Sequence, residues 1–364
     1  MIISPMIQIR STGIVCTRGR GLLPLEAALE AGWNPPVEKE DSDPNTRVPA
    51  FHLPDGVLQD RAIMGKMRRA DRLSKMATLA ACDAWAQAGL SALDPRRVGV
   101  LLATGLGPHA RTFRFLDGIL DFGDCAVSPT DFSHSVHNAA AAYITARLQT
   151  HGPVQTLTDF DFAFHHVLQL AGCWLHEGRC DAVLAGAADE LGAVMLHVCA
   201  HMLDIPADGC PRPLAFSDAP SVVPGEGAVF FVLTRPEGGC ISPLVCVLPG
   251  AATGADMTIA DAGGMSGPES AYLDIARRAS VVANYTPVFG SMMTGAAFHC
   301  ASAARMIEKG VCYANPLPET EHDLPVCKAR CDMGLDGIDC VKRGRDGSWR
   351  TISLRRGMNG VQTG

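Results

Sequence analysis

The stretch GPVQTLTDFDFAFHHVLQLAGCWLHEGRCDAVLAGAAD (residues 152–189) decides the fold, because it predicts a strand, a tight turn, a helix and a second strand in direct succession. Residues 154–157 are a short β-prone run behind a Gly-Pro turn, and apolar side chains then recur at helical spacing over 164–175. Residues 181–188 follow as an apolar strand. Strands this apolar are typical of a parallel sheet covered on both faces, and such sheets place chemistry in the loop at a strand's carboxyl end, which here is 158–162.

The same stretch resembles the nucleophile region of the β-ketoacyl synthases, in which a Gly-Pro turn, a cysteine at the elbow, a long helix and a Gly-x-Cys-Asp-x-x-Leu-Ala-Gly strand follow one another at this spacing. Counting from Gly152-Pro153 to Gly178–Asp181 requires no insertion or deletion, and it puts Asp161 where the family has its nucleophilic cysteine. The resemblance therefore implies the family's fold without its nucleophile.

Further motifs extend the resemblance on both sides. DRLSKMATLAACDAWAQAGL (71–90) followed by VGVLLATGLG (98–107) is similar to the N-terminal half of the family, and GEGAVFFVL (225–233) is similar to its Gly-Glu-Gly-Ala signature. SPTDFSHSVHNAAAA (128–142) resembles a branch that includes the chain-length-factor partners of bacterial aryl-polyene synthases. The resemblance covers residues 60–356, strongly in the first half and weakly in the second.

The resemblance implies a thiolase-like α/β fold of five layers, αβαβα, made of two similar halves at 1–240 and 241–364. In the first half, the patterns predict a strand over 7–15, helices over 25–31 and 61–88, a strand over 98–104 and a helix from 128 to about 149. In the second half they predict a strand over 243–248, helices over 268–283 and 294–309, and a hairpin of strands 337–342 and 349–354.

Composition excludes several classes of protein. With 364 residues, of which 47% are hydrophobic and 19% charged, the chain can bury an extensive core. Its 31 basic and 38 acidic residues give a formal net charge of −7 without a long basic run, so we expect no nucleic-acid partner. The 14 cysteines are scattered singly and no signal peptide is recognisable, which predicts reduced thiols in a cytoplasmic protein. No apolar run is long enough to predict a membrane span.

A ketosynthase needs a thiolate nucleophile and two imidazoles that stabilise and protonate the developing enolate. The resemblance places the nucleophile position at Asp161, the first histidine position at Asp261 or Ala262, and the second at Ser291. The family's nearby lysine falls near Thr286. None of these positions keeps its group, so the resemblance implies a degenerate site with no imidazole and no confident catalytic residue.

The carboxylates and imidazoles near the elbow have structural interpretations as well. A carboxylate at Asp161 can cap the N-terminus of the following helix, which we favour over a catalytic role. Asp159 and Asp161 could form an acid/base dyad, but side chains two positions apart rarely face one another. Of His165 and His166, we expect one to pack against the core or a partner.

Aromatic side chains surround the expected nucleophile position at Phe160, Phe162 and Phe164. They are candidates for the floor of an acyl tunnel, together with Met292 and with Leu335, which replaces the gating aromatic of the family's glycine-rich loop. Ordinary core packing explains the three phenylalanines equally well.

The spacing of the possible ligands argues against a metal site, and we expect no other cofactor. The possible ligands near the C-terminus lack the close pairing of zinc ribbons, and they are Cys312, Cys327, Cys331, Cys340 and His322.

Three functions follow from these observations. The favoured one is a catalytically silent, chain-length-factor-like subunit that forms a heterodimer with an active β-ketoacyl synthase and meets an acyl carrier protein. The alternative is an enzyme in its own right, a decarboxylase or hydrolase of acyl chains that uses Asp161 in place of the cysteine. The third is a homodimeric scaffold or binding protein. In the family, the strand before the elbow, here 153–157, pairs with its copy across the dimer axis.

Overall fold

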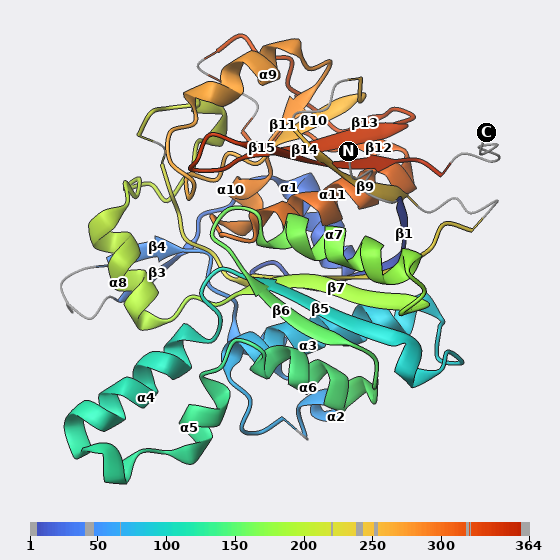
Figure 1. The fold of residues 1–364 in the computed structure, drawn as a ribbon. Helices are drawn as coiled ribbons and strands as arrows, with labels where there is room; N and C mark the ends of the chain where they lie inside the picture. Colours follow the sequence, from blue (N-terminus) through green and yellow to red (C-terminus); the bar gives the residue numbers. More distant parts are fainter. Residues whose placement is uncertain are drawn as a thin grey trace.

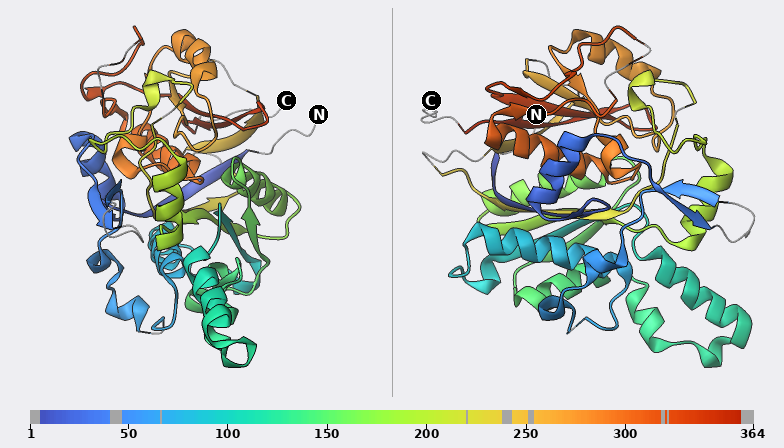
Figure 2. Two further views of the ribbon diagram at one scale, coloured as in Figure 1. Left: turned by 90° about the vertical axis from the view of Figure 1, so that its left-hand side faces the viewer. Right: turned by 180° about the vertical axis from the view of Figure 1, so that it is seen from behind.

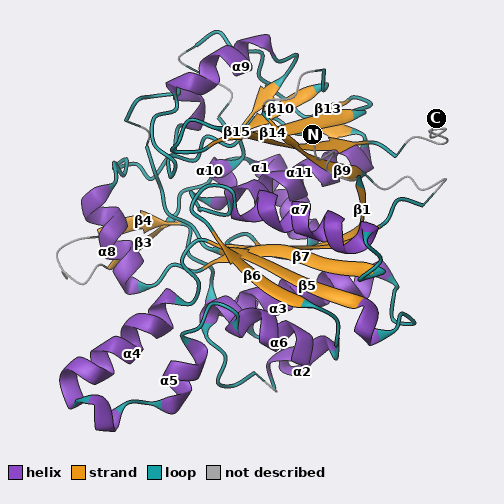
Figure 3. Cartoon of the chain, in the orientation of Figure 1, coloured by secondary structure: helices purple, strands orange, loops and turns teal. Residues whose placement is uncertain are grey.

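The computed structural model describes residues 6–40, 47–65, 67–219, 221–237, 243–250, 254–317, 320 and 322–357. Two sections of β-sheet lie one above the other, with helices between them and on their outer faces (Figures 1 and 3). None of the helices in these ranges combines the length and the apolarity that a membrane span requires.

The first sheet section contains the stretch that decides the fold. Its strands follow the order β1 (Ile7–Cys16), β8 (Gly227–Thr234), β7 (Ala182–Asp189), β5 (Val98–Thr104) and β6 (Val154–Thr158). β5 is parallel to both β6 and β7, whereas β8 is antiparallel to β7 and to β1. The two strands predicted on either side of the elbow are therefore confirmed as members of one sheet. β6 is the last strand at its end of the order, and it is largely exposed.

The second section repeats this order and these directions. Its strands are β9 (Leu244–Pro249), β15 (Trp349–Arg355), β14 (Gly337–Arg343), β10 (Met257–Ala260) and β11 (Val282–Ala283). β10 is parallel to β11 and β14, while β15 is antiparallel to β14 and β9. β11, the counterpart of β6, is covered by the segment around Val326, since Val282 forms a β-bridge with it. Two similar halves are thus present, although residue 240, where we divided them, lies outside the described ranges.

Within the described ranges, two residue pairs of β1 and β9, Ile7 with Val245 and Gln8 with Leu244, join the sections into one hydrogen-bonded sheet. The central layer of the molecule consists of α1 (Leu22–Ala31), α7 (Ala163–His176) and α11 (Gly295–Lys309). These helices share one hydrophobic core with strands of both sections.

Two outer layers complete the fold, as the views in Figure 2 also show. α3 (Arg72–Ala88) and α6 (Ala139–Leu148) pack on the outer face of the first section. α9 (Leu273–Arg278) belongs to a smaller core on the outer face of the second. The five-layer α/β fold is therefore confirmed.

The other elements lie around these layers. α4 (His109–Phe122) and α5 (Pro129–His134) project from the body (Figure 1). The remaining helices and strands are β2 (Gly19–Arg20), β3 (Val37–Glu40), β4 (Arg47–Ala50), α2 (Arg61–Met64), α8 (Ala193–Met202), α10 (Thr286–Phe289), β12 (Val311–Cys312) and β13 (Cys331–Asp332). Single 3₁₀ turns span Asp55–Leu58, Pro95–Arg97, Asp124–Ala126, Pro213–Ala215 and Ser270–Tyr272.

Three predicted helices were wrong in their bounds. The helix expected over 61–88 is divided into α2 and α3, because the Asp71 carboxylate accepts the backbone N–H of Ser74 at 2.8 Å and starts a new helix there. The helix expected from 128 breaks between α5 and α6. The one expected over 268–283 is reduced to α9, since its last residues pair as strand β11.

Candidate functional site

The candidate site lies where strands of both sections end next to the amino termini of α7 and α11. In the elbow after β6, the Asp159 carboxylate accepts the backbone N–H groups of Asp161 at 3.1 Å and Phe162 at 3.3 Å. Asp161 itself is turned toward another loop, where Oδ2 accepts the N–H of Arg345 at 3.1 Å and Oδ1 lies 3.4 Å from its Nε. The prediction that Asp161 caps the helix is therefore wrong, because Asp159 binds the backbone of the turn instead.

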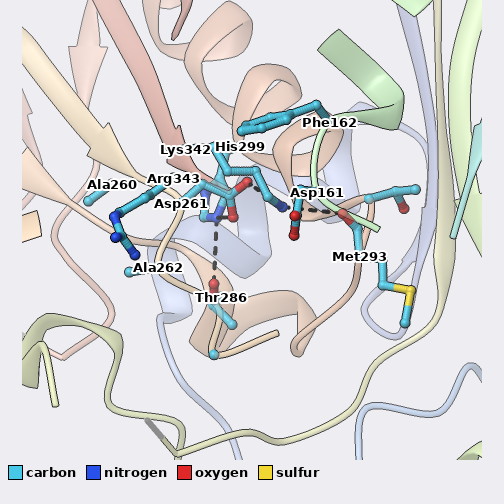
Figure 4. A network of polar contacts seen from close by, with 12 residues as sticks. Asp161, Phe162, Ala260, Asp261, Ala262, Thr286, Met293, His299, Lys342 and Arg343 are labelled. Carbon is cyan, nitrogen blue, oxygen red and sulfur yellow. Dashed lines mark hydrogen bonds and ion pairs between the residues drawn. The ribbon is translucent and has the colours of Figure 1, made fainter. Parts of the chain in front are cut away.

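A buried ion pair occupies the position that we expected for the first family histidine. β10 and β14 run parallel with Ala260 opposite Val341, so the next residues, Asp261 and Lys342, are neighbours at the ends of the two strands. Lys342 Nζ lies 3.2 Å from Asp261 Oδ2, and both side chains are 4% exposed. Nζ also donates to the Met293 carbonyl at 3.2 Å (Figure 4).

Two imidazoles from other positions surround this pair. His299, on α11, has Nε2 3.5 Å from Asp261 Oδ1 and 3.5 Å from Thr286 Oγ1. His165, on α7, is 1% exposed, and neither of its ring nitrogens has a hydrogen-bond partner among the residues that the structure describes. The expectation that one of the two elbow histidines packs in the core is thus confirmed. His166 lies at the surface, with Nδ1 3.4 Å from Asp159 Oδ2.

The pKa shifts in this cluster favour one charged pair among neutral imidazoles. Burial alone would raise the pKa of Asp261, but Lys342 and then His299 outweigh it, so the pKa lies below the ordinary value. Burial lowers the pKa of His299, and it lowers that of His165 to about 3, where the Lys342 charge also contributes. At neutral pH both imidazoles are therefore uncharged and poor proton donors.

The other two degenerate positions, Ala262 and Ser291, carry no titratable side chain. Ala262 is buried, and its carbonyl accepts the side-chain N–H of Asn284 at 3.2 Å. Ser291 is also buried and lines a pocket with an empty volume of about 380 Å³. Met292 lines both this pocket and a second one, of about 220 Å³, over Asp261.

The three phenylalanines have different surroundings. Phe160 is 43% exposed beneath Arg345, whose guanidinium carbon lies 4.9 Å from the ring centroid. Phe162 is buried next to the elbow. Phe164 is 1% exposed and packs on Phe231, with ring centroids 5.7 Å apart, as part of the main core. Only Phe160 and Phe162 therefore adjoin Asp161.

The loop that we compared with the family's gate is held in place at several points. Leu335 is fully buried in the main core. Asp256 accepts the backbone N–H groups of Asp336 at 2.7 Å and of Gly337 at 2.9 Å, and Arg356 Nε donates to the Leu335 carbonyl at 3.3 Å.

Sequence reasoning missed Lys342 and His299. The available signals were a lysine directly after Cys340 and Val341 in the strand GIDCVKR and a histidine within the mostly small, apolar residues of GAAFHCASAA. Among the possible metal ligands, the structure brings Cys312, Cys327 and Cys331 together. His322 and Cys340 lie elsewhere, the former 3.1 Å from the Ala215 carbonyl and the latter buried in β14.

Comparison with known sequences identifies one family. The family described as β-ketoacyl synthase, N-terminal domain, matches residues 45–238. Nodulation protein E of Rhizobium meliloti (strain 1021) is 30% identical over 224 residues, which are 60% of this chain and 54% of that protein. The 3-oxoacyl-[acyl-carrier-protein] synthase 2 of Mycobacterium tuberculosis (strain ATCC 25618 / H37Rv) is 28% identical over 182 residues, 47% of this chain and 43% of that protein. The chain thus spans about half the length of the curated relatives it matches.

Solved structures share the fold over almost the whole chain. The ishigamide ketosynthase/chain length factor superimposes with a TM-score of 0.78 at 17% identity, covering 98% of this chain and 100% of that one. A β-ketoacyl synthase from Burkholderia phymatum STM815 gives 0.78 at 17% identity over 97% and 100% of the two chains. A type II PKS ketosynthase in complex with its acyl-carrier protein gives 0.78 at 15% identity, again over 97% and 100%.

Proposed function

Because the chain belongs to the β-ketoacyl synthase family, we propose that it is a catalytically silent, chain-length-factor-like subunit that pairs with an active β-ketoacyl-ACP synthase in fatty acid or polyketide-type (polyene) biosynthesis. Two of the proteins that share its fold support this proposal, one a ketosynthase/chain length factor and the other a ketosynthase bound to an acyl-carrier protein. We also propose that this chain meets an acyl carrier protein and that it is located in the cytoplasm.

The observation that carries the proposal is the carboxylate at the nucleophile position. Asp161 cannot form a thioester, and its oxygens already contact the backbone and the side chain of Arg345. A carboxylate held by a guanidinium is a weak nucleophile toward an acyl thioester. The first half-reaction of a condensation therefore lacks its acceptor.

The proton chemistry is missing for a separate reason. Enolate stabilisation needs donors aimed at the developing charge, and removal of one such donor typically costs a factor of about 100 to 1,000 in rate. Lys342, the cation nearest to Asp261, is already engaged by that carboxylate and by the Met293 carbonyl. His165 and His299 are neutral and buried.

Pairing is proposed through β6. This strand ends the sheet order and exposes Val154 by 44%, so a partner's strand can continue the sheet there and remove the open edge. We expect a permanent interface that buries more than about 2,000 Å² in total.

A chain-length role assigns Phe162 to the acyl tunnel. Its ring fits so closely against Gly344 that a Cβ atom at position 344 would lie 2.6 Å from it. Phe162→Ala is therefore expected to open space beside the elbow and to lengthen the product of the active partner, as measured by mass spectrometry. Phe164→Ala is the matched control, because Phe164 lies in the core against Phe231 and its loss should lower stability by about 3–5 kcal/mol without a shift in product length.

The whole proposal is tested by comparing the chain alone with the chain co-expressed with an active β-ketoacyl synthase. Each preparation is incubated with acyl- and malonyl-carrier protein, and products and protein adducts are identified by mass spectrometry. We expect product from the pair only, no adduct on Asp161, and the same product from a pair that carries Asp161→Asn.

Two results would contradict it. Condensation by the isolated chain would show that it is not silent. Hydrolysis or decarboxylation of the acyl chain that disappears in Asp161→Asn would instead establish the carboxylate-dependent enzyme. Sedimentation of the two co-expressed chains as separate monomers would remove the proposed interface through β6.

A further inference from the structure

Three cysteines that lie apart in the sequence are brought together beside α11. The two-residue ladder of β12 and β13 places Cys312 directly opposite Cys331. Cys327 lies four positions before Cys331, and its carbonyl accepts the Asn315 N–H at 2.8 Å, which fixes its backbone. All three sulfur atoms lie within 4.8 Å of one another, and the Sγ atoms of Cys327 and Cys331 are 3.8 Å apart.

These separations match the edges of a coordination polyhedron. With Zn–S bonds of about 2.3 Å, tetrahedral geometry places two sulfur ligands about 3.8 Å apart. One edge already has this length, and the others require a contraction of at most about 1 Å. We propose that Cys312, Cys327 and Cys331 form a three-thiolate site for Zn²⁺ or a similar thiophilic divalent cation, a role separate from the proposed chain-length function.

Graded burial gives such an ion a route in. Cys312 is fully buried, Cys327 is partly buried and Cys331 is exposed, so the cluster opens to solvent on one side. Within the described ranges no further Cys, His, Asp or Glu joins the cluster. The fourth coordination position therefore goes to water, as in zinc sites with three protein ligands.

Without a cation, the surroundings of Cys312 and Cys331 favour the neutral thiol. Burial raises the pKa of Cys312, and the two neighbouring sulfurs raise it further. Burial and then Cys327 also raise the pKa of Cys331. A dication reverses this balance, because thiolates close together are stabilised by the shared positive charge. Binding replaces three S–H bonds with three S–Zn bonds and releases three protons to the buffer, with no change of oxidation state.

The bound ion would tie together two parts of the second half. Cys312 follows the carboxyl end of α11, and Cys331 is two residues before Met333, where the loop that carries Leu335 begins. A cation at this position would fix the entry to that loop, in addition to the hydrogen bonds from Asp256 and Arg356 further along it. The arrangement differs from that of a zinc ribbon, because the third ligand, Cys312, comes from the paired strand β12 rather than from the same turn as Cys327 and Cys331.

The test uses the full chain, reduced with a phosphine, stripped with a chelator and titrated with Co²⁺ and then with Zn²⁺. We expect one Co²⁺ per chain, an absorbance band in the near ultraviolet from thiolate-to-cobalt charge transfer, and loss of that band when Zn²⁺ is added. Cys331→Ser and Cys327→Ser should each lose the band. Cys173→Ser, which changes an exposed cysteine on α7, is the matched control and should keep it.

Circular dichroism of each variant establishes that it is folded, and Cys331→Ser is the decisive variant because its side chain is exposed. A folded, fully reduced wild-type chain that binds neither ion would overturn the proposal. The same conclusion follows if Cys327→Ser and Cys331→Ser bind Co²⁺ as the wild type does, or if these sulfurs form a disulfide in air even with Zn²⁺ present.

Discussion

Replacing Lys342 with methionine is expected to destabilise the protein by several kcal/mol, because it leaves the Asp261 carboxylate buried without its cation. The two charged atoms are 3.2 Å apart, and each side chain is 4% exposed. At an effective dielectric constant of about 20, the Coulomb attraction across such a distance is about 5 kcal/mol. Measured losses on removal of one partner of a buried pair are about 3–5 kcal/mol. The double variant Asp261→Asn, Lys342→Met should lose far less, since it leaves no uncompensated charge.

The loss of unfolding free energy in Lys342→Met should also become smaller as the pH falls. In the wild type the pKa of Asp261 is lowered, since Lys342 and His299 outweigh burial. Such a carboxyl contributes stability that is present above the unfolded-state pKa of about 3.9 and is lost as the pH falls through the folded-state value. Without Lys342, burial dominates and the pKa rises above the unfolded-state value. The folded variant then takes up a proton in mildly acidic solution, so the difference in unfolding free energy from the wild type decreases toward about pH 5.

Urea denaturation followed by circular dichroism at about pH 7.5 and about pH 5.5 measures both effects. Lys309→Met is the matched control, because Lys309 Nζ lies 3.8 Å from Glu26 and the lysine side chain is 46% exposed. Its loss should cost no more than about 1 kcal/mol at either pH. The reasoning is refuted if Lys342→Met is as stable as the control variant, or if the double variant is less stable than Lys342→Met alone.

Three further predictions concern the core, the close packing of β1 and the sheet edge. His165→Leu should make the unfolding free energy fall less steeply in acid. The folded-state pKa of His165 is about 3, so this imidazole alone costs the wild type about 1.4 kcal/mol per pH unit as the pH falls below about 6.5. Thermal melts of the variant from about pH 7 to pH 4 that keep the wild-type slope would contradict this. Gly13→Ala should lower the melting temperature sharply, because its Cβ atom would lie 2.0 Å from the Ala80 carbonyl oxygen. Gly118→Ala in α4 is the control: its Cβ atom meets open space, and the unfolding free energy should rise by about 0.5–1 kcal/mol. Equal effects of the two substitutions would be inconsistent with the close approach of β1 and α3. Val154→Lys should shift the sedimentation of the dimer toward that of the monomer. Leu23→Lys, at a residue 76% exposed on α1, is the control and should leave the sedimentation unchanged. A dimer that withstands Val154→Lys would place the interface away from β6.

The strands and the central helix around Asp161 could be predicted from sequence because their signals are local. A Gly-Pro turn, a helical apolar period and an apolar strand lie within 38 consecutive residues, 152–189. Helix bounds were less accurate, since single side chains decide them: Asp71 starts α3 ten residues after the expected helix start at Arg61. α4 was not predicted. Eight of its fourteen residues are exposed, among them Phe113, Leu116, Leu120 and Phe122, so this helix buries little of its apolar surface.

The candidate site could be predicted only where counting along one segment was sufficient. Asp161 was located in that way. The contact of Asp261 with Lys342 depends on the register of β10 against β14, two strands separated by about 80 residues, and on which residues follow the paired ones. His299 joins them from a helix, and the cysteines of the proposed metal site meet through a ladder of only two residue pairs. Contacts of this kind are set by the folded topology, so the local sequence can point to single unusual residues but not to which of them meet.

The two ends of the sheet differ in a way that limits assembly. β6 and β11 hold equivalent places in the repeated order, yet β11 is covered by the chain's own segment at Val326, whereas β6 is exposed. A sheet that can be extended at both ends can grow into a fibre, because each added copy offers a new edge. A sheet that can be extended only at β6 can pair with one further sheet. If two copies of this chain pair through β6, growth of the sheet stops after that single addition, because each copy covers its own β11 edge.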